Sequence, residues 1–141
     1  MRSLGSKSNR SWFWPLLLTV AISVASGRSK IATPGLFQFD KAAHFLVFGL
    51  LATLVVRLGE GRRAAWLALL VVSLYGMADE WHQSFTPGRS VELADWMADT
   101  AGAALAVMLY ACWPRYRAQL ETPLGRKARV ENPGANAPSS V

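Results

Sequence analysis

Ionisable side chains gather in one stretch of this 141-residue chain, between positions 79 and 99. The stretch contains Asp79, Glu80, His82, Gln83, Arg89, Glu92, Asp95 and Asp99. Carboxylates and imidazoles transfer protons or bind divalent cations, and a guanidinium binds phosphate. Apolar segments flank the stretch, and a charge beside such segments usually faces a partner, a cavity or a ligand. A polar site held by apolar helices is therefore the first hypothesis.

Four apolar segments must position these side chains, and they contain no Asp, Glu, Lys or Arg and a single histidine, His44. They are residues 11–26, 42–56, 64–78 and 100–113. The chain is 52% apolar and 17% charged, and four buried helices of a soluble domain would leave almost no polar sequence to cover them. We therefore predict an all-α membrane protein, a bundle of four transmembrane helices. Its spans are expected at about 11–27, 41–58, 63–83 and 92–113, with flanking polar residues at the membrane boundary.

Basic residues are more numerous in the two tails and the second loop than in the first and third loops. Three lie in the N-terminal tail, three in the second loop and five in the C-terminal tail, against three in the first loop and one in the third. The positive-inside rule then predicts that both ends are cytoplasmic, with tails at 1–10 and 114–141. The C-terminal tail is rich in Pro, Gly and Asn and is expected to be mostly disordered. Alternatively, the first segment is a cleaved signal peptide, because small residues at 24–26 precede Gly27.

With this topology, three polar segments meet on the outer side of the membrane. Asp40 and His44 are four residues apart and share a helix face, as do Asp95 and Asp99. The candidate ligand-binding residues are Asp40, Lys41, His44, Glu80, Gln83, Arg89, Asp95 and Asp99. Six carboxylates face only two bases here, which requires protonated acids, a bound cation or access of solvent. Small residues would let the helices approach closely, at Gly76, Ala98, Gly102 and Ala106.

Several roles remain open for these residues. Lys41 and Arg89 could pair with carboxylates and only lock the helices together. A metal could bind candidates among His44, His82 and Glu80, although HExxH and tight His/Cys spacing are absent. Acid–base hydrolysis is a further alternative, but no catalytic residue is assigned and the chain is not expected to be an enzyme. We expect no cofactor and no nucleic-acid partner, because the basic residues are scattered without an aromatic platform.

Two motifs resemble the VanZ-like family of small bacterial membrane proteins. The first is Asp40-Lys41-x-x-His44-Phe45-x-x-Phe48-x-x-Leu51. The second is Asp79-Glu80-x-His82-Gln83-x-Phe85-x-Pro87-Gly88-Arg89, followed by Asp95-x-x-x-Asp99-x-x-Gly102. Together they cover about half the chain, from Phe39 to Leu109.

The resemblance implies a multi-pass protein of the bacterial plasma membrane, in which the predicted topology places the polar cluster on the outer side. The family takes its name from resistance to glycopeptide antibiotics, chiefly teicoplanin. By analogy, the site would bind an envelope lipid, a lipid-linked cell-wall precursor or an amphiphilic antibiotic. The expected role is in glycopeptide resistance or envelope homeostasis, and the oligomeric state is left open.

Overall fold

The protein is described by a computed structural model that covers residues 12–28 and 37–121. These residues form five α-helices and no strand, as the sequence predicted for the fold class. The helices are α1 (Phe13–Ser26), α2 (Phe37–Val56), α3 (Gly61–Gln83), α4 (Leu93–Cys112) and α5 (Pro114–Glu121). The predicted N-terminal tail at 1–10 and residues 122–141 of the predicted disordered tail lie outside the described part of the chain.

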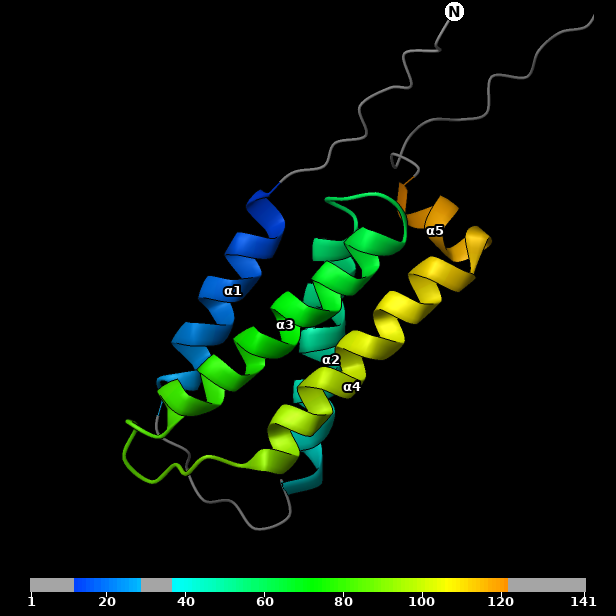
Figure 1. Ribbon diagram of the computed structural model, residues 1–141. Helices are drawn as coiled ribbons and strands as arrows, with labels where there is room; N and C mark the ends of the chain where they lie inside the picture. The colour runs from blue at the N-terminus through cyan, green and yellow to red at the C-terminus, as the bar shows by residue number, and fades with distance from the viewer. Residues whose placement is uncertain (1–11, 29–36, 122–141) are drawn as a thin grey trace, which may run out of the picture.

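Helices α1 to α4 run in alternating directions, so the start of α1 and the short helix α5 lie at the same end of the bundle (Figure 1). The opposite end gathers the last turns of α1 and α3 with the first turns of α2 and α4 (Figure 1). Most of the ionisable residues selected from the sequence belong to these turns, so we call it the polar end. The other is called the apolar end.

Helix α5 was not among the predicted helices, because the apolar pattern stops at Trp113. Proline at the first helical position suits a helix start, since its φ is already helical and its missing N–H is not needed there. Contacts outside the helix hold it in place: Arg57 Nη2 donates to the backbone oxygen of Leu120 (2.6 Å), and the Tyr110 hydroxyl donates to Glu121. A helix without an apolar stripe therefore depends on partners distant in the sequence.

Close packing of α2 against α4 forms the centre of the bundle. A Cβ atom added to Gly102 would lie 2.0 Å from the backbone oxygen of Phe45, and one added to Gly49 would lie 3.2 Å from the oxygen of Gly102. Only glycine permits such an approach of two backbones. Of the small residues selected from the sequence, Gly76, Gly102 and Ala106 are buried and Ala98 is half-buried.

The apolar end has a core of ordinary composition. It consists of buried Leu51, Ala52, Val56, Ala68, Val72, Ala103, Val107 and Tyr110. Phe48 lies at the boundary with the polar end, where its ring stacks between His44 and Tyr75 at centroid distances of 6.2 and 5.7 Å.

Within the described residues, no helix combines the length and the apolar composition needed to cross a membrane.

The outer surface of the bundle carries many large apolar side chains. More than half of the side-chain surface is exposed at Val20, Leu46, Leu50, Trp66, Leu67, Leu70, Leu74, Met77, Trp81, Met97 and Met108. Four carboxylates lie inside instead, and Asp79, Glu80, Asp95 and Asp99 are at most 3% exposed. This distribution is the reverse of the usual one, in which charged residues are almost never fully buried unless they are paired.

Candidate functional site

Lys41 joins the first turn of α2 to the start of α4. Its Nζ lies 2.6 Å from Asp95 Oδ1 and 3.3 Å from Glu92 Oε2. Asp95 lies in the first turn of α4, where the helix dipole favours a negative charge, and Glu92 is the residue that precedes the helix. Asp95 is 1% exposed, so the ammonium group compensates a carboxylate that has lost its water.

His44 lies one turn further along α2 and faces the same helix. Its Nδ1 donates to Asp99 Oδ1 (2.9 Å), and its Nε2 lies 4.0 Å from Asp95 Oδ2. The helical spacing explains this pairing, since Lys41 and His44, three residues apart, share one face of α2, while Asp95 and Asp99, four residues apart, share one face of α4. Asp99 is completely buried, and the imidazole is its hydrogen-bonding partner.

Glu80 brings α3 into the same group. Its Oε2 accepts a hydrogen bond from the backbone N–H of Glu92 (2.9 Å), which ties the end of α3 to the residue before α4. Four residues earlier on α3, Gly76 leaves room for the Asp99 carboxylate: a Cβ added there would lie 2.9 Å from Asp99 Oδ2. Glu80 Oε1 and Asp99 Oδ2 are buried and have no hydrogen-bonding partner among the described residues.

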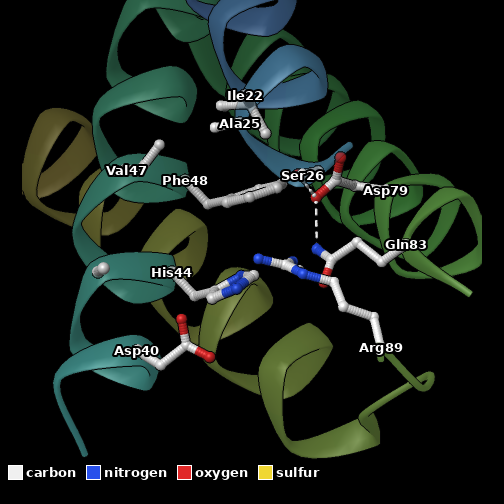
Figure 2. A pocket seen from close by; sticks show the side chains of 11 residues that line it. Ile22, Ala25, Ser26, Asp40, His44, Val47, Phe48, Asp79, Gln83 and Arg89 are labelled. Carbon is white, nitrogen blue, oxygen red and sulfur yellow. Dashed lines mark hydrogen bonds between the residues drawn. The ribbon is translucent and has the colours of Figure 1, made fainter. Parts of the chain in front are cut away.

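A cavity of about 170 Å³ opens beside this group, between α1, α2 and the end of α3 (Figure 2). Polar lining comes from Ser26, Asp40, His44, Asp79, Gln83 and Arg89, and apolar lining from Ile22, Ala25, Ala43, Val47 and Phe48. Figure 2 shows the Arg89 side chain extending from the loop after α3 across the cavity toward His44. The cavity therefore combines one cation, two carboxylates and an apolar wall.

Hydrogen bonds in series fix the wall formed by α1 and α3. Ser26 Oγ donates to Asp79 Oδ2 (2.7 Å), and Gln83 Nε2 donates to the same oxygen (2.9 Å). Arg89 Nη1 then donates to Gln83 Oε1 (2.5 Å). Figure 2 shows these two side chains together with Ser26 and Asp79. Asp79 Oδ1 and Arg89 Nε, both buried, have no partner within the described part of the chain.

A tight turn sends Arg89 back toward the cavity. Gly88 has a φ of +80°, which an L side chain rarely adopts, and Arg89 N–H donates to the backbone oxygen of Thr86 (3.1 Å). Glycine supplies this conformation without steric cost. The position of the guanidinium thus depends on two residues that carry no chemistry themselves.

The eight residues selected from the sequence fall into two groups in space. Asp40, His44, Gln83 and Arg89 line the cavity. Lys41, Glu80, Asp95 and Asp99 form the network behind it, and His44 belongs to both groups. His82, a metal candidate from the sequence, is exposed and lies near Gly27.

Sequence reasoning missed Ser26, and it placed Asp79 in the polar stretch without including it among the candidate ligand-binding residues. The spacing of four residues between Asp79 and Gln83 on a helix was an available signal, because it places the two side chains on one face. Ser26 gave no such signal: it is a small residue at the end of an apolar segment, and its role depends on the approach of α1 to α3. Tyr75 strengthens that approach, since its hydroxyl donates to the backbone oxygen of Thr19 (2.9 Å) and lies 3.0 Å from Ser23 Oγ.

These features define a class: a small all-α bundle with an apolar exterior and a buried polar group at one end. The model of the VanZ/LLP1 family matches residues 3–114, and the chain belongs to that family. It is also similar to an uncharacterized protein of Schizosaccharomyces pombe, with 37% identity over 73 residues. These residues are 50% of this chain and 45% of the yeast protein, so the chain spans about half the length of that relative. No solved structure matches the chain significantly.

Proposed function

We propose that this protein is a multi-pass membrane protein whose polar end binds the head group of an anionic envelope lipid in the cavity beside Arg89. Helices α1 to α4 would be the four membrane-embedded helices. Both chain ends would lie in the cytoplasm, and the polar end would face outward in a plasma membrane.

The apolar exterior supports placement in a membrane. Large side chains that are more than half exposed occur on all four helices, among them Val20 on α1, Leu46 on α2, Leu70 on α3 and Met108 on α4. In water, so continuous an apolar surface would mark an interaction site or a tendency to aggregate. Lipid tails would cover it without cost. Partners inside the bundle meanwhile bind one oxygen of each of the four buried carboxylates, as polar groups at membrane depth require.

The distribution of basic residues supports the proposed orientation. Arg57, Arg62 and Arg63 lie at or near the turn between α2 and α3, at the apolar end, where α1 begins and α5 lies (Figure 1). Along the sequence, eleven lysines and arginines fall before α1, in this turn or after α4, against four in the first and third loops. The positive-inside rule assigns the richer side to the cytoplasm. Cysteine labelling tests this in a Cys112→Ala background: an impermeant reagent should label Thr86→Cys and spare Glu60→Cys, and the reverse pattern would contradict the orientation.

The state of Arg89 carries the head-group proposal. Its guanidinium lies in the cavity, uses Nη1 for Gln83, and has a buried Nε with no partner among the described residues. A buried donor without a partner loses free energy, and a phosphate oxygen is the acceptor that a guanidinium binds best. Ile22, Val47 and Phe48 supply an apolar wall for the first part of an acyl chain. The lining is therefore amphiphilic in the way that a lipid is.

The size of the cavity supports a lipid head group rather than an antibiotic as the ligand. Pockets for whole drug-sized ligands usually hold roughly 300 to 1,000 Å³, whereas this cavity holds about 170 Å³. A head group fits this space, but a glycopeptide could only lie across its opening. One similar protein comes from a yeast, and anionic lipids are available in yeast as well as in bacteria. A contribution to teicoplanin resistance would then be indirect, through the lipid.

Thermal unfolding of the purified protein in detergent tests the proposal. The probes are phosphatidylglycerol, a polyprenyl phosphate, phosphatidylcholine and teicoplanin. A ligand at about 100 times its Kd should stabilise the folded protein by about 2.7 kcal/mol. The two anionic lipids should raise the unfolding temperature of the wild type and of the control Arg62→Gln, but not of Arg89→Gln. Equal shifts with phosphatidylcholine, or an undiminished shift in Arg89→Gln, would reject the head-group site. A shift with teicoplanin alone would make the antibiotic the ligand.

A helix-locking role is the second candidate, and the contacts of Lys41 favour it. One ammonium group holds two carboxylates at the start of α4, and the same cluster joins three helices. If locking is the whole role, Arg89→Gln will lower the unfolding temperature and no lipid in the panel will change it in either protein.

A further inference from the structure

We propose that a divalent first-row transition-metal cation, Zn²⁺ or Mn²⁺, binds His44, Glu80 and Asp99 at the polar end. The three residues come from α2, α3 and α4, and one ligand atom of each lies within 4.8 Å of the other two. Glu80 and Asp99 are at most 2% exposed, and His44 is half-buried. Glu80 is 36 positions after His44, and Asp99 is 19 positions after Glu80, so no short sequence motif predicts the site.

Two carboxylate oxygens in this group are buried without a partner in the described residues, and they carry the inference. Glu80 holds the backbone of Glu92 through Oε2 and leaves Oε1 free, and Asp99 holds His44 through Oδ1 and leaves Oδ2 free. Buried polar atoms are nearly always satisfied, so each exception needs an explanation. For Glu80, one oxygen held by an outer backbone N–H and one free oxygen is also the arrangement in which outer partners orient metal ligands.

The donor set narrows the choice of ion. Mg²⁺ and Ca²⁺ prefer ligand sets made of oxygen, whereas an imidazole nitrogen with two carboxylate oxygens suits Zn²⁺ and Mn²⁺. Ligands around tetrahedral Zn²⁺ at about 2.1 Å are about 3.4 Å apart, so ligand atoms within 4.8 Å of one another must approach by at most about 1.4 Å. Three protein ligands would leave a coordination position open, as in catalytic rather than structural zinc sites.

The local charge supports the same inference. Six carboxylates lie at the polar end, from Asp40, Asp79, Glu80, Glu92, Asp95 and Asp99. The described lysines and arginines of this end are Arg28, Lys41 and Arg89, so the formal excess is three negative charges, of which a divalent cation would offset two. Gly76 is the complementary structural feature, because its missing Cβ leaves the space that Asp99 Oδ2 occupies.

A cation in this position would also serve the proposed lipid site. His44 lines the cavity, so an ion bound to it would add positive charge on the side opposite Gln83 and favour a phosphate group. That consequence depends on the proposed function. The metal site itself does not, since it can be measured without any lipid.

Metal binding to the purified full chain is the test, with Zn²⁺ and Mn²⁺ alone as probes after treatment with a chelator. Calorimetry and elemental analysis should give one ion per wild-type chain. Glu80→Gln and Asp99→Asn are nearly isosteric, and each should weaken binding by about 100-fold or more, since the loss of an outer partner already costs 10- to 100-fold. Co²⁺ absorption bands should report a nitrogen and oxygen site in the wild type and be lost in both variants.

The two histidines form a matched pair of controls. His44→Ala should abolish binding, whereas His82→Ala, at the exposed histidine of the same end, should leave it unchanged. Circular dichroism and gel filtration identify variants that remain folded. A wild type that binds less than one ion per chain, or ions bound equally by folded Glu80→Gln and Asp99→Asn, would overturn the site. Ion binding without any lipid effect would retain the metal site and reject the head-group proposal.

Discussion

The two ends of the bundle are equally well buried but hold their helices together in different ways. At the apolar end, Leu51, Val56, Val72 and Val107 pack as a continuous core. At the polar end, hydrogen bonds and ion pairs take over, from Lys41 to Asp95 and from Ser26 to Asp79. Dispersion contacts are many and individually weak, whereas polar contacts are few and depend on exact partners.

The two ends also differ in whether their buried polar atoms have hydrogen-bonding partners. All the buried side-chain nitrogens and oxygens that lack a partner in the described residues lie at the polar end, on Asp79, Glu80, Arg89 and Asp99. If the helices needed only to pack against one another, an apolar core could hold them together at both ends. The polar end is therefore the part of the molecule whose composition is better explained by a ligand than by stability.

Gly102→Ala should have the largest effect, because it separates α2 from α4 at the boundary of the two ends. The new Cβ would lie 2.0 Å from a backbone oxygen, which cannot rotate away. We expect a loss of about 3 kcal/mol or more in the free energy of unfolding, the upper part of the range for overpacking. Thermal unfolding in detergent measures it. Ala101→Leu is the control on the exposed face of α4, and equal behaviour of the two variants would contradict the close approach of the helices.

Leu51→Ala should damage the apolar end alone. Leu51 is 2% exposed, and the cavity left behind is expected to cost about 2 kcal/mol. Binding of lipid or metal at the polar end should be unchanged once the protein is folded, because the Leu51 side chain makes no hydrogen bond to the residues of that end. Unfolding and binding measured on the same sample check this. A loss of binding larger than the loss of stability would mean that the ends are not separable.

Ser26→Ala should have the smallest effect, and it sharpens the comparison by testing one polar contact. The change removes the donor to a buried Asp79 oxygen, which Gln83 still serves, so we expect a loss of about 1 kcal/mol. Thermal unfolding again measures it. Ser23→Ala is the matched control on α1, where the partner is the half-buried hydroxyl of Tyr75. If both changes are neutral, polar contacts do not hold α1 in the bundle.

The all-helical composition and the family were predictable from the sequence, and both predictions are confirmed. Apolar segments of 14 to 16 residues without charges can form helices and cannot form the alternating strands of a half-exposed sheet. The membrane placement, the ligand and the metal remain proposals. Helix α5 was missed because its stability comes from Arg57 and Tyr110 and not from its own composition.

The sequence alone determined which residues share a helix face, since Asp40 with His44 and Asp95 with Asp99 follow from the period of the helix. Only the tertiary structure decided which of these faces meet. It placed Lys41 on Asp95, His44 on Asp99, and Ser26 of α1 on Asp79. Local periodicity determines the direction of a side chain within one helix, but the rotation and crossing of neighbouring helices depend on how glycines such as Gly102 pack, which no single segment encodes.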